Sequence, residues 1–337
     1  MPMIKTGYDL PIRPAVVSFS GGRSSAYMLW HILQAHGGTL PDDIHVNFAN
    51  TGKEREETLD FVARIQSEWG VHINWIERAK GNKTDYEVVS HNSASRNGEP
   101  FEAFLNTQKK LPSPGKGGRT CTADLKIRPM NLFVKKELGI KKWSPVIGFR
   151  ADEMHRVAKL WACGNEDENQ AEFIFHNDPK KKKRKRKKAK WETEGMHPQT
   201  PMAWDSNATR GGVREWWKRM PFDLGIESYE GNCDMCFLKR ESTIKYLMRK
   251  HPSMAEWWIR QEAVRRNFKY DTAQVFRLDR PKYADILEGI RKEDYLKARE
   301  FADLTGGQVR NTEEFWQWMR EKESRDEIRL DECACHD

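Results

Sequence analysis

Short apolar runs alternate with amphipathic stretches of helical length along the first half of the chain. Four apolar runs of strand length lie at residues 15–19, 44–48, 72–76 and 145–149. Residues 26–33 and 54–69, which follow the first two runs, lack helix breakers and have helical composition. Strands that alternate with helices at this spacing predict an α/β fold, with a parallel sheet covered by helices on both faces.

The pattern changes after residue 160. We therefore divide the chain into an α/β domain at 1–160, an insertion at 161–200 and a mainly helical C-terminal domain at 201–337. The insertion turns from acidic to basic with little periodic apolar content, which predicts that it is at least partly disordered. Tryptophan-rich stretches of helical pattern follow it at residues 213–220, 242–249, 253–267 and 311–321. Residues 92–118 are rich in Gly, Pro, Ser and Asn, which predicts a loop or lid.

Hydropathy and charge narrow the class of protein. No apolar run approaches the roughly 20 residues that a membrane span requires, and the N-terminus lacks the pattern of a secretion signal. We therefore expect a cytoplasmic protein without a membrane partner. The net charge of +8 is local, because ten of the eleven residues from Lys180 to Lys190 are Lys or Arg and the rest of the chain is near −2. Such a run either contacts DNA or RNA phosphates or is a solvated linker.

The first predicted strand runs into a serine- and glycine-rich turn that precedes a helix. The turn consists of Ser20, Gly21, Gly22, Arg23, Ser24 and Ser25. Backbone N–H groups at a helix start are unpaired and the helix dipole is positive there, so this turn is suited to hold a phosphate. It is not a Walker A loop, because that spacing and its lysine are missing. An ordinary connection between a strand and a helix is the alternative.

A second polar turn follows the next strand at its carboxyl end, where open α/β sheets place ligands. Together the turns resemble those of the PP-loop superfamily, in its phosphoadenosine-phosphosulfate-reductase-like branch. That family has Ser-Gly-Gly-x-x-Ser after the first strand and polar-Thr-Gly-x-Glu-x-x-x-Thr after the second, matched here by Asn50, Thr51, Gly52, Glu54 and Thr58. The resemblance implies an adenine-nucleotide-alpha-hydrolase-like fold that binds ATP or phosphoadenosine phosphosulfate. Ser24 and Asn50 stand where aspartates are common, so the match supports nucleotide binding more strongly than hydrolysis.

The six cysteines are too few for a disulfide framework in a chain of 337 residues, and their clustering favours metal or redox chemistry. Cys121 lies between Arg119 and Lys126, and these cations should favour its thiolate. The segment resembles the Cys-Cys-x-x-Arg-Lys-x-x-Pro motif of the iron–sulfur reductases. Cys121, Lys126 and Pro129 match it, whereas Thr122 replaces the second cysteine.

A third turn, at residues 148–156, is similar to the family's Gly-x-Arg-x-x-Glu-x-x-Arg sequence. Arg150 and Arg156 are suited to bind phosphate or sulfate oxygens bidentately, with Glu153 orienting one of them. The alternative is a solvated helix start with an Arg/Glu ion pair. The position of the turn after a predicted strand favours the site.

Cys233 and Cys236 form a Cys-x-x-Cys pair, which binds a metal ion or a cluster edge only when further ligands complete the set. The resemblance implies that Cys121 supplies the third ligand and that the three cysteines hold a [4Fe-4S] cluster. Structural zinc and unliganded core thiols are the alternatives.

The chain ends in Cys333, Ala334, Cys335, His336 and Asp337, which is similar to the Glu-Cys-Gly-x-His tail of the sulfonucleotide reductases. The resemblance implies that Cys333 attacks the sulfate sulfur, with His336 as its companion. Alternatively, Cys335 or Cys333 is the fourth cluster ligand, or the tail is disordered. Cys163 receives no role.

Three functions are compatible with these residues. The first is a PP-loop enzyme that uses ATP or a sulfonucleotide and an iron–sulfur cluster to move sulfur, with a nucleic acid as one class of acceptor. In it the first turn holds the phosphates, the second turn holds the nucleoside, and Arg150, Arg156 and Lys126 act as catalytic cations. The second is a true phosphoadenosine phosphosulfate reductase that uses Cys333. The third is a non-catalytic nucleic-acid-binding regulator on a PP-loop scaffold. A homodimer and a complex with a partner protein both stay open.

Overall fold

The computed structural model describes residues 5–81, 85–108, 111–114, 120–162, 196–231, 233–267, 272–305 and 317–318. The basic run at 180–190 and the tail with Cys333, Cys335 and His336 lie outside these residues, as do Arg119 and Cys163. Among the helices of the described part, none is both long and apolar enough to cross a membrane.

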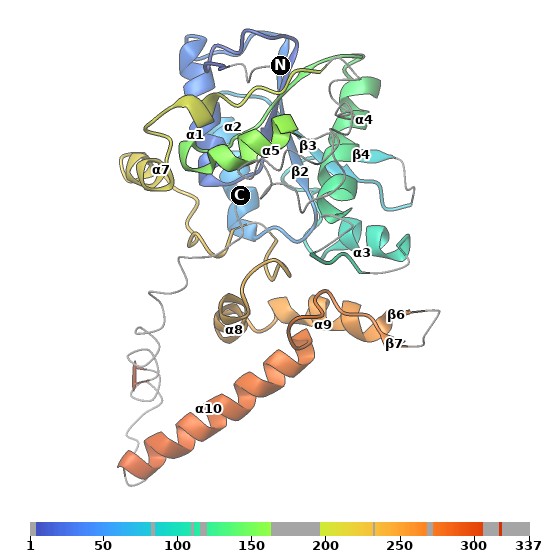
Figure 1. Ribbon diagram of the computed structural model, residues 1–337, viewed down its shortest axis with the longest axis vertical. Coiled ribbons are helices and arrows are strands. Elements are labelled where there is room, and N and C mark those ends of the chain that lie inside the picture. Colours follow the sequence, from blue (N-terminus) through green and yellow to red (C-terminus); the bar gives the residue numbers. More distant parts are fainter. Residues whose placement is uncertain are drawn as a thin grey trace, which may run out of the picture.

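Five strands of the described part form one sheet in the order β4-β3-β2-β1-β5 (Figure 1). They are β1 (Ala15–Phe19), β2 (Ile44–Asn50), β3 (Ile73–Arg78), β4 (Tyr86–Val89) and β5 (Ser144–Val146). β1 pairs in parallel with both β2 and β5, β2 pairs in parallel with β3, and β4 is antiparallel to β3 at the edge. The α/β class and the mostly parallel sheet are confirmed.

Helices cover both faces of this sheet. Alternate residues of a strand point to opposite sides, so the apolar side chains of the strands are buried under helices on both faces. The helices are α1 (Arg23–Ala35), α2 (Glu56–Glu68), α3 (Glu99–Asn106), α4 (Arg128–Lys136) and α5 (Met154–Ala162). Val17 belongs to a buried cluster that includes Leu29 of α1 and Val62 of α2. Val16, its neighbour in β1, packs in another cluster with Phe133 of α4.

Two elements lie where the sequence pattern predicted none. The predicted loop or lid at 92–118 contains α3, whose Phe101, Phe104 and Leu105 are buried at the spacing of one helix face. The segment around its eight residues is rich in glycine and proline, which obscures the helical pattern. Pro100 lies near the start of the helix, where proline is tolerated. β4 has only four residues and its Val88 is exposed, as is common for an edge strand.

A second buried cluster forms the helical part that the sequence predicted. It joins α8 (Glu241–Lys250), α9 (Met254–Val264) and α10 (Tyr283–Thr305), with Trp258 and Tyr283 fully buried at its centre. α9 is shorter than predicted, because Arg265 adopts an extended conformation and the chain enters the two-residue strands β6 (Arg266–Asn267) and β7 (Thr272–Ala273). Residues of α3 pack in this same cluster, so α3 belongs to both halves of the molecule.

The chain returns to the α/β core after the insertion. α7 (Arg210–Trp217) lies against α1 (Figure 1), and its Val213 and Trp217 belong to the same buried cluster as the first strands. Phe222, Leu224 and Ile226 continue this packing. The change from one core to the other therefore comes after residue 226, some distance beyond the predicted boundary at residue 201.

Candidate functional site

The turn between β1 and α1, residues Ser20 to Ser25, depends on a glycine. Gly21 has φ +77°, and a Cβ built on it would lie 2.8 Å from Thr58 Cγ2 and 3.0 Å from Phe48 Cε2. Both the backbone conformation and the close approach of α2 and β2 exclude a larger residue. We call residues Ser20 to Ser25 the serine–glycine turn.

Two serines hold the serine–glycine turn in shape. Ser25 Oγ donates to Gly22 O at 2.9 Å and lies 2.9 Å from Ser20 Oγ. Among the described residues, none caps the start of α1 with a side chain, and its first turn contains no acidic residue. The N–H of Gly22 donates to Ser20 Oγ at 3.4 Å, whereas no described side chain caps the following N–H groups of this helix, which leaves them available to an anion.

A cavity of about 870 Å³ lies against the serine–glycine turn. Its other walls come from Thr58 of α2, from Arg150, from α7 and from the segment at 220–231. Two acidic side chains line it, Asp223 and Glu227. Five cationic side chains line it as well: Arg23, Arg150, Arg210, Arg214 and Lys218. This volume lies in the range of ligand sites, and we call it the cationic cavity.

The structure places Arg150 in the lining of the cationic cavity, together with the serine–glycine turn. Arg150 is only 6% exposed. Its Nη1 donates to Ser24 Oγ at 3.4 Å, and its Nε donates to Asp152 Oδ1 at 3.1 Å. The backbone N–H of Arg150 donates to Glu153 Oε2 at 3.1 Å. The guanidinium is thus held beside the serine–glycine turn, where a bound phosphate would need a positive charge.

Arg156 is placed differently and is not among the residues that line the cavity. Its Nη1 donates to Glu153 Oε1 at 2.6 Å, and its guanidinium lies 4.5 Å from the ring centroid of Phe149. The arrangement is the helix-start ion pair that the sequence left as an alternative. Of the two arginines of this motif, Arg150 is the one in position to contact a ligand in the cavity.

The second turn is buried behind the cavity wall rather than in it. Asn50 is fully buried, and its Nδ2 donates to Glu77 Oε1 at 2.7 Å and to Ser95 O at 2.8 Å. Its Oδ1 accepts the N–H of Gly52 at 3.0 Å. All hydrogen-bonding atoms of the Asn50 side chain are therefore used within the protein, and in this structure neither Asn50 nor Gly52 lines the cavity.

Glu77 organises this region, and the sequence analysis did not find it. The carboxylate is fully buried in β3 and accepts the backbone N–H and the hydroxyl of Ser95, both at 2.6 Å. A charged residue at the end of an otherwise apolar strand was the available signal, because buried carboxylates need several donors.

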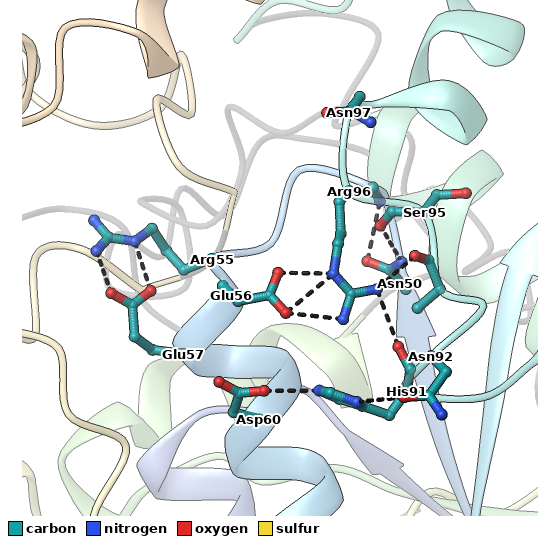
Figure 2. A network of polar contacts seen from close by, with 12 residues as sticks. Asn50, Arg55, Glu56, Glu57, Asp60, His91, Asn92, Ser95, Arg96 and Asn97 are labelled. Atoms are coloured by element: carbon teal, nitrogen blue, oxygen red, sulfur yellow. Dashed lines mark hydrogen bonds and ion pairs between the residues drawn. The ribbon is translucent and has the colours of Figure 1, made fainter.

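An exposed network ties the loop that contains Ser95 to α2. Figure 2 shows Arg96 beside Glu56, whose two oxygens accept from its Nε at 2.8 and 3.0 Å. Asp60 Oδ1 lies 2.7 Å from His91 Nε2. Glu56, Asp60 and His91 place ligand atoms within 4.8 Å of one another. Arg96 pairs with Glu56 and His91 hydrogen-bonds to Asp60, so we assign this group to holding the loop.

Three thiols from distant parts of the chain converge next to the second turn. They are Cys121, Cys233 and Cys236, which we call the thiol cluster; Cys121 and Cys233 pack against the second core, and Cys236 interacts electrostatically with both. Thr51 Oγ1 lies 3.5 Å from Cys233 Sγ and donates to Glu54 Oε1 at 3.1 Å. Because Gly231 lines the cationic cavity, the thiol cluster lies within a few residues of the cavity wall.

Lys126 joins the thiol cluster to the start of α2. Its Nζ donates to Glu54 Oε1 at 3.2 Å, and the Glu54 carboxylate is fully buried. Glu54, aided by Cys233 and Cys121, outweighs burial and raises the pKa of Lys126. Lys126 is therefore a fixed positive charge beside the thiols, although its nearest anion is Glu54 and not a ligand.

The pKa values of Cys121 and Cys233 are raised in this environment, contrary to the sequence-based expectation for Cys121. Burial and the neighbouring Cys236 raise the pKa of Cys121 to about 11, although Lys126 and Thr122 oppose this. Burial and Glu54 likewise raise the pKa of Cys233. The expectation failed because burial and the neighbouring Cys236 outweigh the favourable effect of Lys126 on the Cys121 thiolate.

The residues present fit a metal cluster. Buried thiolates are costly unless a metal compensates their charge, and here three thiols and a buried carboxylate meet beside one lysine. Glu54 Oε2 is buried without a hydrogen-bond partner in the described part of the chain. The three sulfurs do not all lie within 4.8 Å of one another, whereas zinc with bonds of about 2.3 Å would hold them closer.

Two buried lysines, Lys53 and Lys239, support the loop that holds the Cys-x-x-Cys pair, and neither was found from the sequence. Lys53 Nζ lies 2.8 Å from Asp234 Oδ2, and Trp258 Nε1 donates to Asp234 Oδ1 at 2.8 Å. Lys239, which is 1% exposed, donates to the carbonyls of Tyr229 and Gly231 at 2.8 and 2.7 Å. Charged residues inside and directly after the Cys-x-x-Cys sequence were the available signal.

The cations of α7 were also missed. Arg210, Arg214 and Lys218 are spaced four residues apart, which places them on one side of a helix. The sequence pattern of this stretch indicated only its tryptophans, Trp216 and Trp217, which are core residues or border the core.

Comparison with known proteins adds relatives without a described activity. No family model matches the chain. It is 28% identical over 233 residues to an uncharacterized nin region protein, ORF290, of Escherichia phage lambda, across 68% of this chain and 67% of the relative. It is 27% identical over 161 residues to an uncharacterized protein, MJ0066, of Methanocaldococcus jannaschii, across 45% of this chain and 28% of that one. The chain therefore has similar proteins in a phage and in an archaeon.

Proposed function

We propose that this protein is a PP-loop enzyme of the phosphoadenosine-phosphosulfate-reductase-like type, which binds an adenine nucleotide and moves sulfur with the help of an iron–sulfur cluster. The observation that carries the proposal is the adjacency of two features. The serine–glycine turn and Arg150 border one cavity, and Cys233 of the thiol cluster is two residues along the chain from Gly231, which lines the same cavity. The motif resemblance supplies the identity of the ligand and of the cluster.

The phosphate end of the proposed site is the serine–glycine turn. N–H groups at the start of α1 would bind phosphate oxygens, with Ser24 and the Arg150 guanidinium contributing a hydroxyl and a positive charge. If ATP is the substrate, an acceptor oxygen attacks the α-phosphorus and pyrophosphate leaves, and Arg150 neutralises the charge that develops. In the proposal, the side chains and backbone of Asn50, Thr51 and Gly52 do not bind the ligand directly, because their polar groups are bonded within the protein. They support the residues that form the cavity wall.

The thiol cluster would hold the iron–sulfur group through Cys121, Cys233 and Cys236. When bound, such a group supplies electrons or a site for sulfur. Glu54 and Lys126 position the cluster loop: Lys126 offers a fixed positive charge near thiolate ligands, and Glu54 anchors that lysine. In the proposal, the fourth ligand comes from Cys335 or Cys333 or from a bound substrate.

The first experiment is anaerobic purification of the full chain with a visible absorbance spectrum and iron, sulfide and zinc analysis. We expect about four iron and four sulfide per chain, as for a [4Fe-4S] cluster. Cys233→Ser should lose the iron, and Cys163→Ser, at a cysteine without an assigned role, should keep it. Protein that carries only zinc, or neither metal, would contradict the cluster.

Nucleotide binding is the second readout. We expect Arg150→Gln to weaken ATP binding about tenfold or more, the effect of losing a charge-assisted phosphate contact. Arg156→Gln is the matched control and should change the affinity less than about threefold, because Arg156 contacts Glu153 and Phe149 instead. Deleting residues 331–337 then separates the two substrate types: loss of sulfonucleotide reduction with retained pyrophosphate release from ATP would assign the tail to a reductase.

A further inference from the structure

Three cations of α7 form one wall of the cationic cavity. Arg210, Arg214 and Lys218 follow one another at intervals of four residues, and all three line the cavity. Arg219 is next in sequence to Lys218 and lies outside the lining. These cations therefore line the cavity together with the serine–glycine turn, which comes from a distant part of the chain.

Cations outnumber the acidic residues of the lining. Asp223 pairs with Arg23, whose Nε donates to its Oδ1 at 2.6 Å. Glu227 is the other acidic residue of the lining, and Lys218, directly after α7, lies with its Nζ 2.7 Å from Glu215 Oε1. Like charges spaced four apart on a helix repel one another, and a bound anion would relieve that repulsion.

The excess of cations in this cavity contrasts with the net charge of the chain. Apart from the basic run at 180–190, that net charge is near −2. Five cationic and two acidic side chains nevertheless meet in this one space. Clefts lined by one sign of charge concentrate ligands of the opposite sign.

A chain of hydrogen bonds joins this wall to the phosphate end. Ser24 Oγ accepts from Arg150 at 3.4 Å, Arg150 Nε donates to Asp152 at 3.1 Å, and the other oxygen of Asp152 accepts the N–H of Arg210 at 3.0 Å. Asp152 thereby fixes the α7 wall relative to the serine–glycine turn. The cavity of about 870 Å³ between them is far larger than one phosphate group.

We infer that Arg210, Arg214 and Lys218 form a second anion subsite, which takes a phosphate or sulfate group separate from the one on the serine–glycine turn. The inference deepens the proposed function, on which it rests, by stating that the site takes ligands with two anionic groups. The second group belongs either to the phosphate chain of the nucleotide itself or to an anionic co-substrate. Both share the chemistry that three cations on one helix side recognise.

Calorimetric titration of the full chain with inorganic phosphate, pyrophosphate and tripolyphosphate tests the subsite without relying on the adenine group. The variant is Arg214→Gln with Lys218→Gln, since both side chains are exposed and tolerate substitution. We expect tripolyphosphate affinity to fall about tenfold or more and phosphate affinity to change less than about threefold. Arg219→Gln removes a charge from the same stretch and should leave both within about twofold. Equal losses for phosphate and tripolyphosphate, or a control that matches the variant, would overturn the subsite.

Sulfate titration of the ATP-saturated protein distinguishes the two sources of the second group. If the nucleotide supplies it, ATP blocks sulfate binding; if a co-substrate does, sulfate still binds and the variant loses it. The failures are separable. Tripolyphosphate binding that depends on α7, without any preference for ATP, would sustain the subsite and refute the nucleotide proposal. ATP binding that is weakened by Arg150→Gln but unchanged in the Arg214→Gln, Lys218→Gln variant would support the nucleotide proposal and refute the subsite.

Discussion

Residues that match the same sequence motif make different contacts in this structure, depending on their neighbours. Arg150 reaches the cationic cavity, whereas Arg156 in the same motif pairs with Glu153 and stacks on Phe149. Asn50 stands where aspartate is common in the resembling family, and the structure supplies a reason. Its amide donates to the buried Glu77 carboxylate, which an aspartate would face as a second negative charge.

Asn50→Asp should therefore destabilise the fold. An uncompensated charge in a buried pair costs about 3–5 kcal/mol, and here two carboxylates would share one dry site with Ser95. We expect the free energy of unfolding, measured in urea at pH 7, to fall by that order, and the loss to shrink at low pH as a carboxyl takes up a proton. Asn92→Asp, on an exposed residue beside His91, is the control and should change stability by less than about 0.5 kcal/mol. Equal stability of the two variants would refute this account of Asn50.

Ion pairs of the buried Glu230 connect helices α2 and α8 at the junction between the two cores. Glu230 is 2% exposed and lies 3.4 Å from Arg55 Nη1, just before α2 begins, and 3.1 Å from Lys250 Nζ, at the end of α8. Burial would raise the pKa of Glu230, but the N–H of Glu227 and the Lys250 and Arg55 charges outweigh it, and the pKa is lowered. One carboxylate thus connects an α2 terminus to an α8 terminus.

Glu230→Gln should lower stability in a pH-dependent way. A glutamate whose folded pKa is below its unfolded value of about 4.3 stabilises the fold above that pH, and the contribution disappears as the pH falls through the folded pKa. We expect a loss of about 1–3 kcal/mol at pH 7 that becomes small below about pH 4. Urea unfolding at several pH values measures it. Glu256→Gln, on the exposed side of α9, serves as the control. A loss independent of pH would show that the charge of Glu230 is not what stabilises the junction.

The whole molecule combines two cores and an uneven distribution of charge. The second core takes residues from α3 as well as from α8, α9 and α10, so the thiol cluster is held from both halves. The net charge of +8 depends on the ten cations at 180–190, without which it would be near −2. A dense run of this kind attracts phosphates without base specificity.

Replacing the basic run with a Gly/Ser segment of equal length should separate nucleic-acid binding from the cavity. We expect the natural chain to bind duplex DNA or RNA at low salt, with a slope of log affinity against log salt of about −0.9 per phosphate contacted. The replaced chain should lose this binding and keep its ATP affinity. The Arg214→Gln, Lys218→Gln variant should keep its nucleic-acid binding. Undiminished binding by the replaced chain would place the nucleic-acid surface elsewhere or exclude one.

Local patterns were sufficient for much of the α/β part. β1 begins and ends at the predicted residues, because its apolar run stops where the serine–glycine turn starts. α1 and α2 lie where breaker-free stretches follow strands. α3 and β4 were missed because each is short and draws its stability from contacts made elsewhere: α3 from the second core, and β4 from pairing with β3.

The sequence by itself determined which residue types are available to the site: a glycine turn of the right geometry, the arginine of the third turn, and three cysteines in two clusters. Tertiary structure decided what those residues are next to. Arg23 meets Asp223 and Thr51 meets Cys233 across separations of 200 and 182 residues. Burial and charge depend on such long-range neighbours, so the raised thiol pKa values, the enclosed Asn50 and the cationic wall of α7 could not be read from spacing along the chain.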